Sequence, residues 1–245
     1  MLSFIKNHPF RIKAFFNSSL VITHAVKSEE LMNKIPSCVQ LDTFKDKWGF
    51  IAVAVVQTKH LRPAIFPQSC GMNFLLIGYR MFVTYQTSYG KRLRGLYILR
   101  SETDKTLMQL VGNFFTHYNY SKTDIILTED VEKISISSNK SEIDITLLKT
   151  PDARLPQNSP FESWKEARKF EGPLPFTFYV NQDEREVLIV EGVRQNWTPA
   201  PLEIGHCKIG FIEKMNLQTI VPANAFVIKN ISYHWKKGVI DKCSQ

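Results

Sequence analysis

The sequence of 245 residues lacks most of the patterns that identify a function directly. It has no run of about 20 apolar residues, the length that a membrane-spanning helix requires. It has no Walker or GxGxxG glycine pattern, so a nucleotide-binding fold has no support. The six histidines form no HxH or HExxH pair, which argues against a metal site. No GxSxG sequence marks a nucleophilic serine. We therefore predict no metal and no cofactor.

Cysteine is scarce as well. The four cysteines stand at positions 38, 70, 207 and 243, too far apart for a CxxC pair or a zinc knuckle. We interpret them as buried or incidental thiols in a reducing compartment. The apolar N-terminal segment is interrupted by Arg11, Lys13 and Asn17 and is followed by no small-residue cleavage site, which argues against a signal peptide. The sequence therefore predicts a cytoplasmic protein with no membrane partner.

Apolar residues and an excess of positive charge are what the sequence does have. Hydrophobic residues make up 44% and aromatic residues 12%, which excludes a disordered chain. We predict a single domain over residues 1–245, with its core at about 18–236. The net charge is +8, but the basic residues are dispersed and the densest groups, at 91–94 and 236–237, are too short for a polybasic tract. A solvated basic surface is the simpler interpretation, and a surface for nucleic acid is the alternative.

Strand patterns dominate the chain, and helix signals are few. One short helix is expected over 28–35, and a second follows a capping box at Ser159–Glu162 and ends at Gly172. Continuous apolar runs such as 50–56 indicate strands that are buried on both faces. The fold class predicted is mostly β (α+β), an antiparallel, closed or nearly closed barrel with two or three short helices. We expect strands at 18–26, 50–56, 72–85, 92–100, 107–115, 131–137, 143–148, 176–180, 184–197, 207–214 and 224–235.

An arginine stands in the middle of the apolar strand predicted over 72–85. Arg80 cannot lose its charge, so its burial requires a carboxylate or several carbonyl oxygens around it. Two interpretations stay open. Its guanidinium faces the inside of the barrel and binds a ligand carboxylate, or it forms an internal salt bridge with Glu102 or Glu191.

Two further segments combine polar groups with apolar surroundings. Strand alternation places Glu191 and Arg194 on opposite faces, so both line a cavity only if the strand bends at Gly192. A structural hydrogen-bond network is the alternative for this pair. In the segment GNFFTHYNY, His117 and Tyr118 offer a titratable ring and a phenol for acid–base chemistry. The alternative for His117 is a hydrogen-bonded residue of the core.

The order of several segments resembles a bacterial family of unknown function that is grouped with the acetoacetate decarboxylase-like superfamily. The resemblance covers about residues 21–235 and implies a β-rich barrel with a central cavity of ligand size. It rests on SEELMNKIP, LDTFKDKWGFIAVAVV, HLRPAIFP, GYRMFVTY, GLYILRSETD, GNFFTHYNY, SPFESWKEARKF and EGVRQNWTP.

The resemblance also implies how the cavity differs from that of the decarboxylases. In those enzymes a lysine with a lowered pKa forms a Schiff base with a β-keto acid. The matching position here is Tyr120, and Lys122 has no lysine beside it, so the resemblance implies that the Schiff-base lysine is absent. The arginine of the strand motif corresponds to Arg80, and the acidic residue that ends the next strand corresponds to Glu102.

Two functional hypotheses follow, and a third possibility is that side chains fill the lumen and the protein is a scaffold. In the first, the barrel binds a small organic acid or a similar polar ligand in its cavity, and proton transfer by His117 is conceivable. In the second, the protein is a non-enzymatic basic module that binds nucleic acid or another anionic partner. A homo-oligomer is compatible with the resemblance. The candidate residues of the first hypothesis are His117 and Tyr118 for catalysis and Arg80, Glu102, Tyr120, Glu191 and Arg194 for ligand binding.

Overall fold

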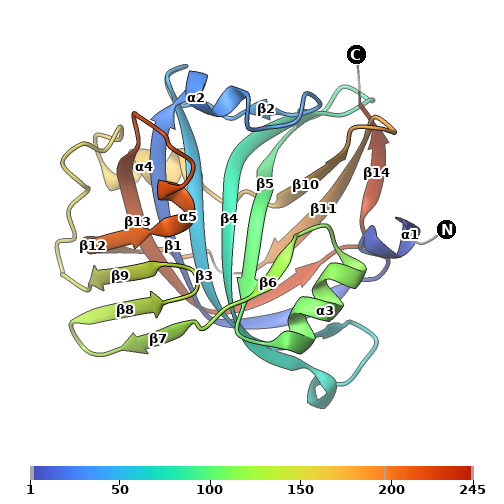
Figure 1. Cartoon of the computed structure of the whole chain (residues 1–245), viewed down its shortest axis with the longest axis horizontal. Coiled ribbons are helices and arrows are strands. Elements are labelled where there is room, and N and C mark those ends of the chain that lie inside the picture. The colour runs from blue at the N-terminus through green and yellow to red at the C-terminus, as the bar shows by residue number, and fades with distance from the viewer. Residues whose placement is uncertain (1–2, 196, 244–245) are drawn as a thin grey trace.

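The computed structural model describes residues 3–195 and 197–243, and strands make up most of it (Figure 1). The strands are β1 Ile12–Lys27, β2 Gln40–Leu41, β3 Trp48–Pro63, β4 Met72–Gln86, β5 Arg92–Thr103, β6 Tyr120–Lys122, β7 Ile126–Glu129, β8 Lys133–Ser138, β9 Ile143–Leu148, β10 Phe176–Asn181, β11 Glu186–Arg194, β12 Ala200–Ile209, β13 Val221–Trp235 and β14 Val239–Lys242. The helices are α1 Ser3–Lys6, α2 Ser28–Met32, α3 Thr106–Phe115, α4 Trp164–Glu171, α5 Gly210–Glu213 and a 3-10 turn at Gln68–Cys70.

The central sheet closes on itself. Its strands pair in the order β11-β10-β5-β4-β3-β1-β13, and the end of β11 then pairs with β13 through Gly192↔Trp235 and Arg194↔Tyr233. Most of these pairings are antiparallel, although β10 runs parallel to β5. The predicted mostly β fold, with a largely antiparallel and closed or nearly closed sheet, is confirmed.

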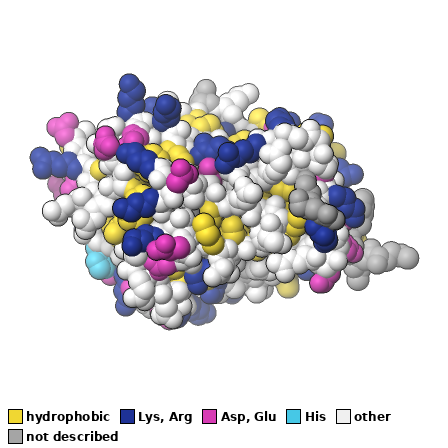
Figure 2. All heavy atoms as spheres, turned by 90° about the horizontal axis from the view of Figure 1, so that it is seen from above, with side chains coloured by type: hydrophobic (Ala, Val, Ile, Leu, Met, Phe, Trp, Pro, Cys, Tyr) yellow, Lys and Arg dark blue, Asp and Glu magenta, His cyan; other side chains and the backbone are white. Residues whose placement is uncertain are grey.

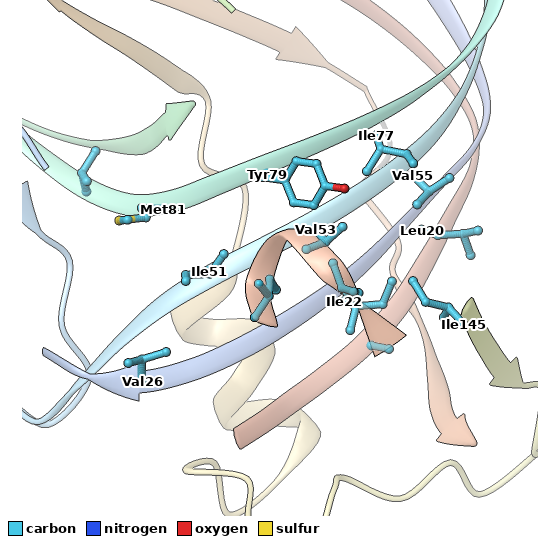
Figure 3. Close-up of a cluster of buried hydrophobic side chains, with 14 of the residues drawn as sticks. Leu20, Ile22, Val26, Ile51, Val53, Val55, Ile77, Tyr79, Met81 and Ile145 are labelled. Carbon is cyan, nitrogen blue, oxygen red and sulfur yellow. The ribbon is translucent and has the colours of Figure 1, made fainter. Parts of the chain in front are cut away.

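The two faces of the long strands β1, β3 and β4 have different roles. On β4 the odd-numbered side chains from Ile77 to Tyr85 are completely buried in the main hydrophobic core, whereas the even-numbered ones from Met72 to Phe82 face the inside of the ring. Burial on both faces accounts for the unbroken apolar run that was expected at 50–56. Figure 3 shows the core side, where β1, β3 and β4 contribute Leu20, Ile22, Val26, Ile51, Val53, Val55, Ile77, Tyr79 and Met81, with Ile145 from β9.

One predicted strand is a helix. Residues 107–115 belong to α3, in which Met108 and Gly112 are buried one turn apart while Leu110 and Phe114 are exposed. Because apolar residues lie on all sides of this helix, the helical period is hidden, and a short apolar run does not separate helix from strand. The strand predicted over 207–214 likewise ends at Ile209, where α5 begins.

The second predicted helix begins later than its capping box suggested. The hydroxyl of Ser159 accepts a hydrogen bond from Phe161 N (3.2 Å) in a turn, and the N-cap of α4 is Ser163, whose hydroxyl accepts from Glu166 N (3.3 Å). The sequence contains two consecutive S-x-x-E patterns, 159–162 and 163–166, and the second of them forms the cap. The helix ends at Glu171, directly before Gly172, as expected.

A disulfide joins two cysteines that are far apart in the sequence. Cys38 lies between α2 and β2, and Cys243 follows β14, the strand that ends the described chain (Figure 1). The expectation of free thiols is therefore wrong for these two residues, and a separation of 205 residues gave no spacing signal. Cys70 and Cys207 are free; Cys70 is exposed, whereas burial raises the pKa of the Cys207 thiol to about 12.

We predict that reduction of this disulfide lowers the free energy of unfolding by about 2–4 kcal/mol, because the cross-link restricts the unfolded chain. Denaturant unfolding with and without reductant measures the change. The variant Cys243→Ser should match the reduced protein and should not respond to reductant. Under denaturing conditions the unreduced protein should present only the thiols of Cys70 and Cys207. Reaction of all four cysteines without reductant would contradict the disulfide.

Candidate functional site

A cavity of about 240 Å³ lies on the inner face of the sheet. Most of its walls are apolar, and they come from β1, β3, β4, β5 and β13, with residues of α3 and the end of α4. Small side chains from the sheet line part of the cavity, namely Ala52 and Ala54 of β3 and Ser101 of β5, and we call this part the cavity floor. Larger side chains at these positions would fill the cavity.

Arg80 points into this cavity from β4. A Cβ atom added at Gly78 would lie 2.9 Å from Arg80 Nε, so the glycine gives room for a guanidinium that extends back along its own strand. Arg80 Nε is buried and has no hydrogen-bond partner. In residues 3–195 and 197–243, no carboxylate forms an ion pair with Arg80. Burial lowers the pKa of Arg80, but a guanidinium keeps its proton in a protein.

A second guanidinium faces the same cavity. Arg194 reaches it because β11 changes partner at Gly192, pairing with β10 before this residue and with β13 after it. A Cβ atom at Gly192 would overlap the hydroxyl of Tyr233, so the bend requires glycine. The Cζ atom of Arg194 lies 3.9 Å from the ring centre of Trp197, and its Nε is buried without a hydrogen-bond partner. Burial, followed by the charge of Arg80, lowers the pKa of Arg194.

Three tyrosines surround Arg80. Burial raises the pKa of Tyr118, Tyr120 and Tyr233, in the case of Tyr120 to about 12, so all three phenols are neutral at physiological pH. A neutral phenol can donate a hydrogen bond to an anion. The hydroxyl of Tyr118 is buried and makes no hydrogen bond of normal geometry. The side chain of Thr177 lies close to this hydroxyl. The cavity thus combines two cations and a phenol donor with apolar walls.

Glu171, the last residue of α4, also lines the cavity. One carboxyl oxygen accepts a hydrogen bond from Asn224 Nδ2 (2.8 Å) and the other from Thr23 Oγ1 (3.3 Å). Burial raises the pKa of Glu171 to about 8, and these two hydrogen bonds oppose the shift. The carboxyl is therefore mostly protonated at neutral pH. Glu171 and Phe226 also border an outer groove of about 340 Å³ between α4 and the β12–β13 pair.

The structure brings together four of the residues expected at the site and separates the other three. Arg80, Tyr118, Tyr120 and Arg194 line the cavity. Glu102 does not line it. A register shift between β4 and β5 at Tyr79/Arg80 turns Glu102 to the core side. There its carboxylate pairs with Arg100 (2.7 Å) and accepts a hydrogen bond from the hydroxyl of Tyr79 (2.8 Å). The prediction that Glu102 lines the cavity beside Arg80 is therefore wrong.

His117 and Glu191 also lie outside the cavity. The ring of His117 stacks on Tyr179 at 3.7 Å, and its Nε2 is 3.1 Å from Asn7 Oδ1. Burial, and secondarily Lys6, lowers the pKa of His117 to about 4. Glu191 pairs with Lys236 (2.9 Å) instead of an arginine. The alternative of an internal salt bridge from Arg80 to Glu102 or Glu191 is therefore wrong.

Three cavity residues were missed by the sequence reasoning. Tyr233 could have been found by alternation along its strand, since it shares a face with Ile231 and Trp235. His8 precedes the first strand, and its ring centre lies 5.8 Å from that of Tyr118. Burial lowers the pKa of His8 to about 4. Neither His8 nor Glu171 carried a local pattern that predicts burial.

The outer surface carries charges of both signs. Figure 2 views the molecule from the side on which α2 lies in Figure 1. On this face Lys and Arg side chains are interspersed with Asp and Glu side chains. Exposed pairs such as Lys45–Glu162 at 2.9 Å contribute little to stability. Within the described residues, no group of three His, Cys, Asp or Glu side chains could hold a metal ion. No described helix is long and apolar enough to cross a membrane.

Comparisons with known proteins agree on one family and one fold. The family DUF2071, described as an uncharacterized conserved protein, matches residues 14–232. No curated protein sequence matches the chain. Acetoacetate decarboxylase from Legionella pneumophila subsp. pneumophila str. Philadelphia 1 superposes with a TM-score of 0.60 at 10% identity, covering 95% of this chain and 87% of that one. An acetoacetate decarboxylase-like enzyme from Sphingomonas wittichii RW1 gives 0.59 at 10% identity, with 96% and 94% covered.

A third solved structure with this fold contains a bound small molecule. The enduracididine biosynthesis enzyme MppR, complexed with the condensation product of pyruvate and imidazole 4-carboxaldehyde, gives a TM-score of 0.57 at 8% identity, with 97% of this chain and 91% of that one covered. At such identities the likeness establishes the fold alone.

The burial of Glu171 leads to a prediction about stability. Its pKa is raised above that of the unfolded chain, so the folded protein binds more protons between about pH 4.5 and 8. Its contribution to stability is therefore present at low pH and is lost as pH rises, by about 1.4 kcal/mol for each pH unit. We expect the variant Glu171→Gln to gain stability relative to the parent over this range.

Melting temperatures of the parent and Glu171→Gln, measured from pH 5 to pH 8, test this expectation. The difference between the two proteins cancels the opposite contribution of the buried histidines His8 and His24, whose pKa values are lowered by burial. A difference that does not change with pH would mean that Glu171 is ionised in the folded protein.

Proposed function

Because the chain belongs to the DUF2071 family and has the acetoacetate decarboxylase-like fold, we propose that its cavity binds a small organic acid whose carboxylate pairs with Arg80. One observation carries this proposal. The Nε atoms of Arg80 and Arg194 are buried in the same cavity without a hydrogen-bond partner. A buried charge without a counter-charge is costly, and a carboxylate ligand supplies the missing partner.

The shape and polarity of the cavity define the ligand further. A planar guanidinium binds a carboxylate through two parallel hydrogen bonds, and the hydroxyl of Tyr118 can donate another. The remaining walls are largely apolar, with rings such as Phe74, Phe82 and Phe226. An apolar body behind the carboxylate is therefore needed to displace water from these walls. We take a hydrophobic monocarboxylic acid as the ligand class.

Relatives with the same fold support a carboxylate at the level of analogy. MppR has also been solved in complex with pyruvate, at a TM-score of 0.51 and 6% identity. Pyruvate is a carboxylic acid, and the cavity proposed here would take the same functional group. This support concerns the fold and not the individual residues.

The proposal is one of binding, and it does not include Schiff-base decarboxylation. Within the described residues, no lysine lines the cavity, and Lys122 is exposed at the end of β6. We also propose no proton transfer by His117, since the ring lies outside the cavity. The alternative of a basic module for nucleic acid finds no specific feature in its favour, because the charges are mixed where Figure 2 shows the surface.

The cytoplasmic location stays a prediction. It rested in part on free cysteines, and the Cys38–Cys243 disulfide removes that part of the argument.

We predict that medium-chain and aromatic carboxylic acids raise the melting temperature of the protein, because a ligand that binds only the folded state stabilises it by mass action. The effect should be lost in Arg80→Leu, which removes the charge, and in Ala54→Leu, which fills the cavity floor. Calorimetric titration of hexanoate, octanoate and phenylacetate measures the affinity of each protein.

Arg92→Ala is the matched control, since it removes an exposed arginine close to Arg80 in the chain, on β5. It should bind the acids as the parent does. Corresponding primary alcohols, which lack the carboxylate, should not bind. Equal stabilisation of the parent and Ala54→Leu would place the ligand elsewhere, and no stabilisation by any acid would refute the proposed function.

His117 provides an internal test of the site's boundary. We expect His117→Ala to bind the acids with unchanged affinity, because its ring contacts Tyr179 and Asn7 and not the cavity. A loss of binding in a folded His117→Ala protein, measured by the same titration, would mean that His117 contributes to ligand binding.

A further inference from the structure

A row of paired residues lies on the inner face of the sheet. Asn224 pairs with Thr23, Thr23 with Ala52, and Ala52 with Arg80, from β13 across β1 and β3 to β4. Ala52 and Arg80 line the cavity, whereas Thr23 and Asn224 lie beyond its lining, beneath Glu171. Directly paired residues project to the same face of a sheet. Because neighbouring strands lie about 4.8 Å apart, the backbones at Thr23 and Arg80 are separated by roughly 10 Å.

The two ends of this row differ in chemistry. At one end Arg80 carries an unpaired positive charge. At the other, the carboxyl group of Glu171 is held by hydrogen bonds from Thr23 and Asn224. Ala52 stands between them in the row, and Glu171 itself lines the cavity, so a molecule lying on Ala52 can contact both Arg80 and Glu171.

Glu171 has a hydrogen to donate. Its two oxygens each accept one hydrogen bond, and the protonated carboxyl carries one O–H in addition. The Thr23 hydroxyl already donates to Glu171, and in the described part of the chain Asn224 Oδ1 is buried without a partner. Glu171 therefore presents one free donor to the cavity opposite Arg80. The unsatisfied acceptor Asn224 Oδ1 lies beside it, where the cavity adjoins the outer groove.

We propose that Glu171 and Asn224 form a second recognition point for a hydroxyl group of the ligand, across the cavity floor from Arg80. A hydroxyl accepts the hydrogen bond from Glu171 and donates one to Asn224 Oδ1, whereas an ether or ketone oxygen only accepts. The ligand is then a hydroxy acid whose hydroxyl lies at the end remote from the carboxylate. This inference rests on the proposed function of Arg80 and narrows its ligand class.

A titration series of matched ligands tests the inference. Octanoate, ω-hydroxyoctanoate and ω-methoxyoctanoate differ only at the far end, and the hexanoate and decanoate series vary the length. We expect the best-fitting ω-hydroxy acid to bind roughly three- to tenfold more tightly than its plain and methoxy analogues, as one or two net hydrogen bonds allow. Glu171→Leu should abolish this preference and still bind the plain acid.

Two further variants separate recognition from general effects on the cavity. Glu171→Gln keeps a neutral donor and should retain most of the preference. Glu162→Gln changes an exposed glutamate that precedes the same helix and should behave as the parent. If Glu171→Leu does not fold, infrared difference spectra of the parent decide. The carbonyl band of protonated Glu171 should shift with the ω-hydroxy acid but not with octanoate, and it should be absent in Glu171→Gln.

The outcomes distinguish this inference from the function on which it rests. Plain acids that bind through Arg80 with no gain from a hydroxyl would refute the inference and leave the proposed function intact. A preference that persists in folded Glu171→Leu, or a carbonyl band that does not shift, would also refute it. Failure of every acid to bind would refute both.

Discussion

The closure of the sheet between β11 and β13 creates the space on which the cavity and its polar groups depend. At Gly192 the strand leaves β10 and joins β13, and the contact with the Tyr233 hydroxyl leaves no room for a side chain there. This bend places Arg194 on the inner face of the ring. The odd-numbered side chains of β4 then pack into the core, and the even-numbered ones are confined inside the ring with few polar partners.

Among the described residues, the charged groups inside the ring lack the ion-pair partners that the buried charge on the core side has. Two guanidiniums, a phenol and a protonated carboxyl lie among apolar walls. The carboxyl does not pair with either guanidinium, although a salt bridge would lower the cost of burying all three groups. By contrast, the buried Glu102 on the core side has both a cation and a phenol as partners. In the part of the chain that the structure describes, the two guanidiniums of the cavity thus lack the carboxylate partner that Glu102 gives to Arg100, which is typical of sites that satisfy their charges with a ligand.

Sequence reasoning reached the fold and part of the site for identifiable reasons. Arg80 stood out because a permanent charge in an apolar strand requires an explanation, and alternation gave its face correctly. The resemblance placed Glu102 with Arg80, but the register shift beside Tyr79 turns Glu102 to the core side and leaves no mark in the sequence. The helical period of 107–115 was hidden by apolar residues on all sides.

For Glu171 the sequence predicts the position in the helix but not the burial of the side chain. Its position at the end of α4 follows from the Gly172–Pro173 stop, which the sequence displays. Its burial follows from where that helix end meets β1 and β13, which no pattern of period two or 3.6 encodes. Thr23 and Asn224 are far apart in the chain and become neighbours only through strand pairing. The same pairing continues through Ala52 to Arg80, so one backbone register places the residues that hold the acid and the cation on the same face of the sheet.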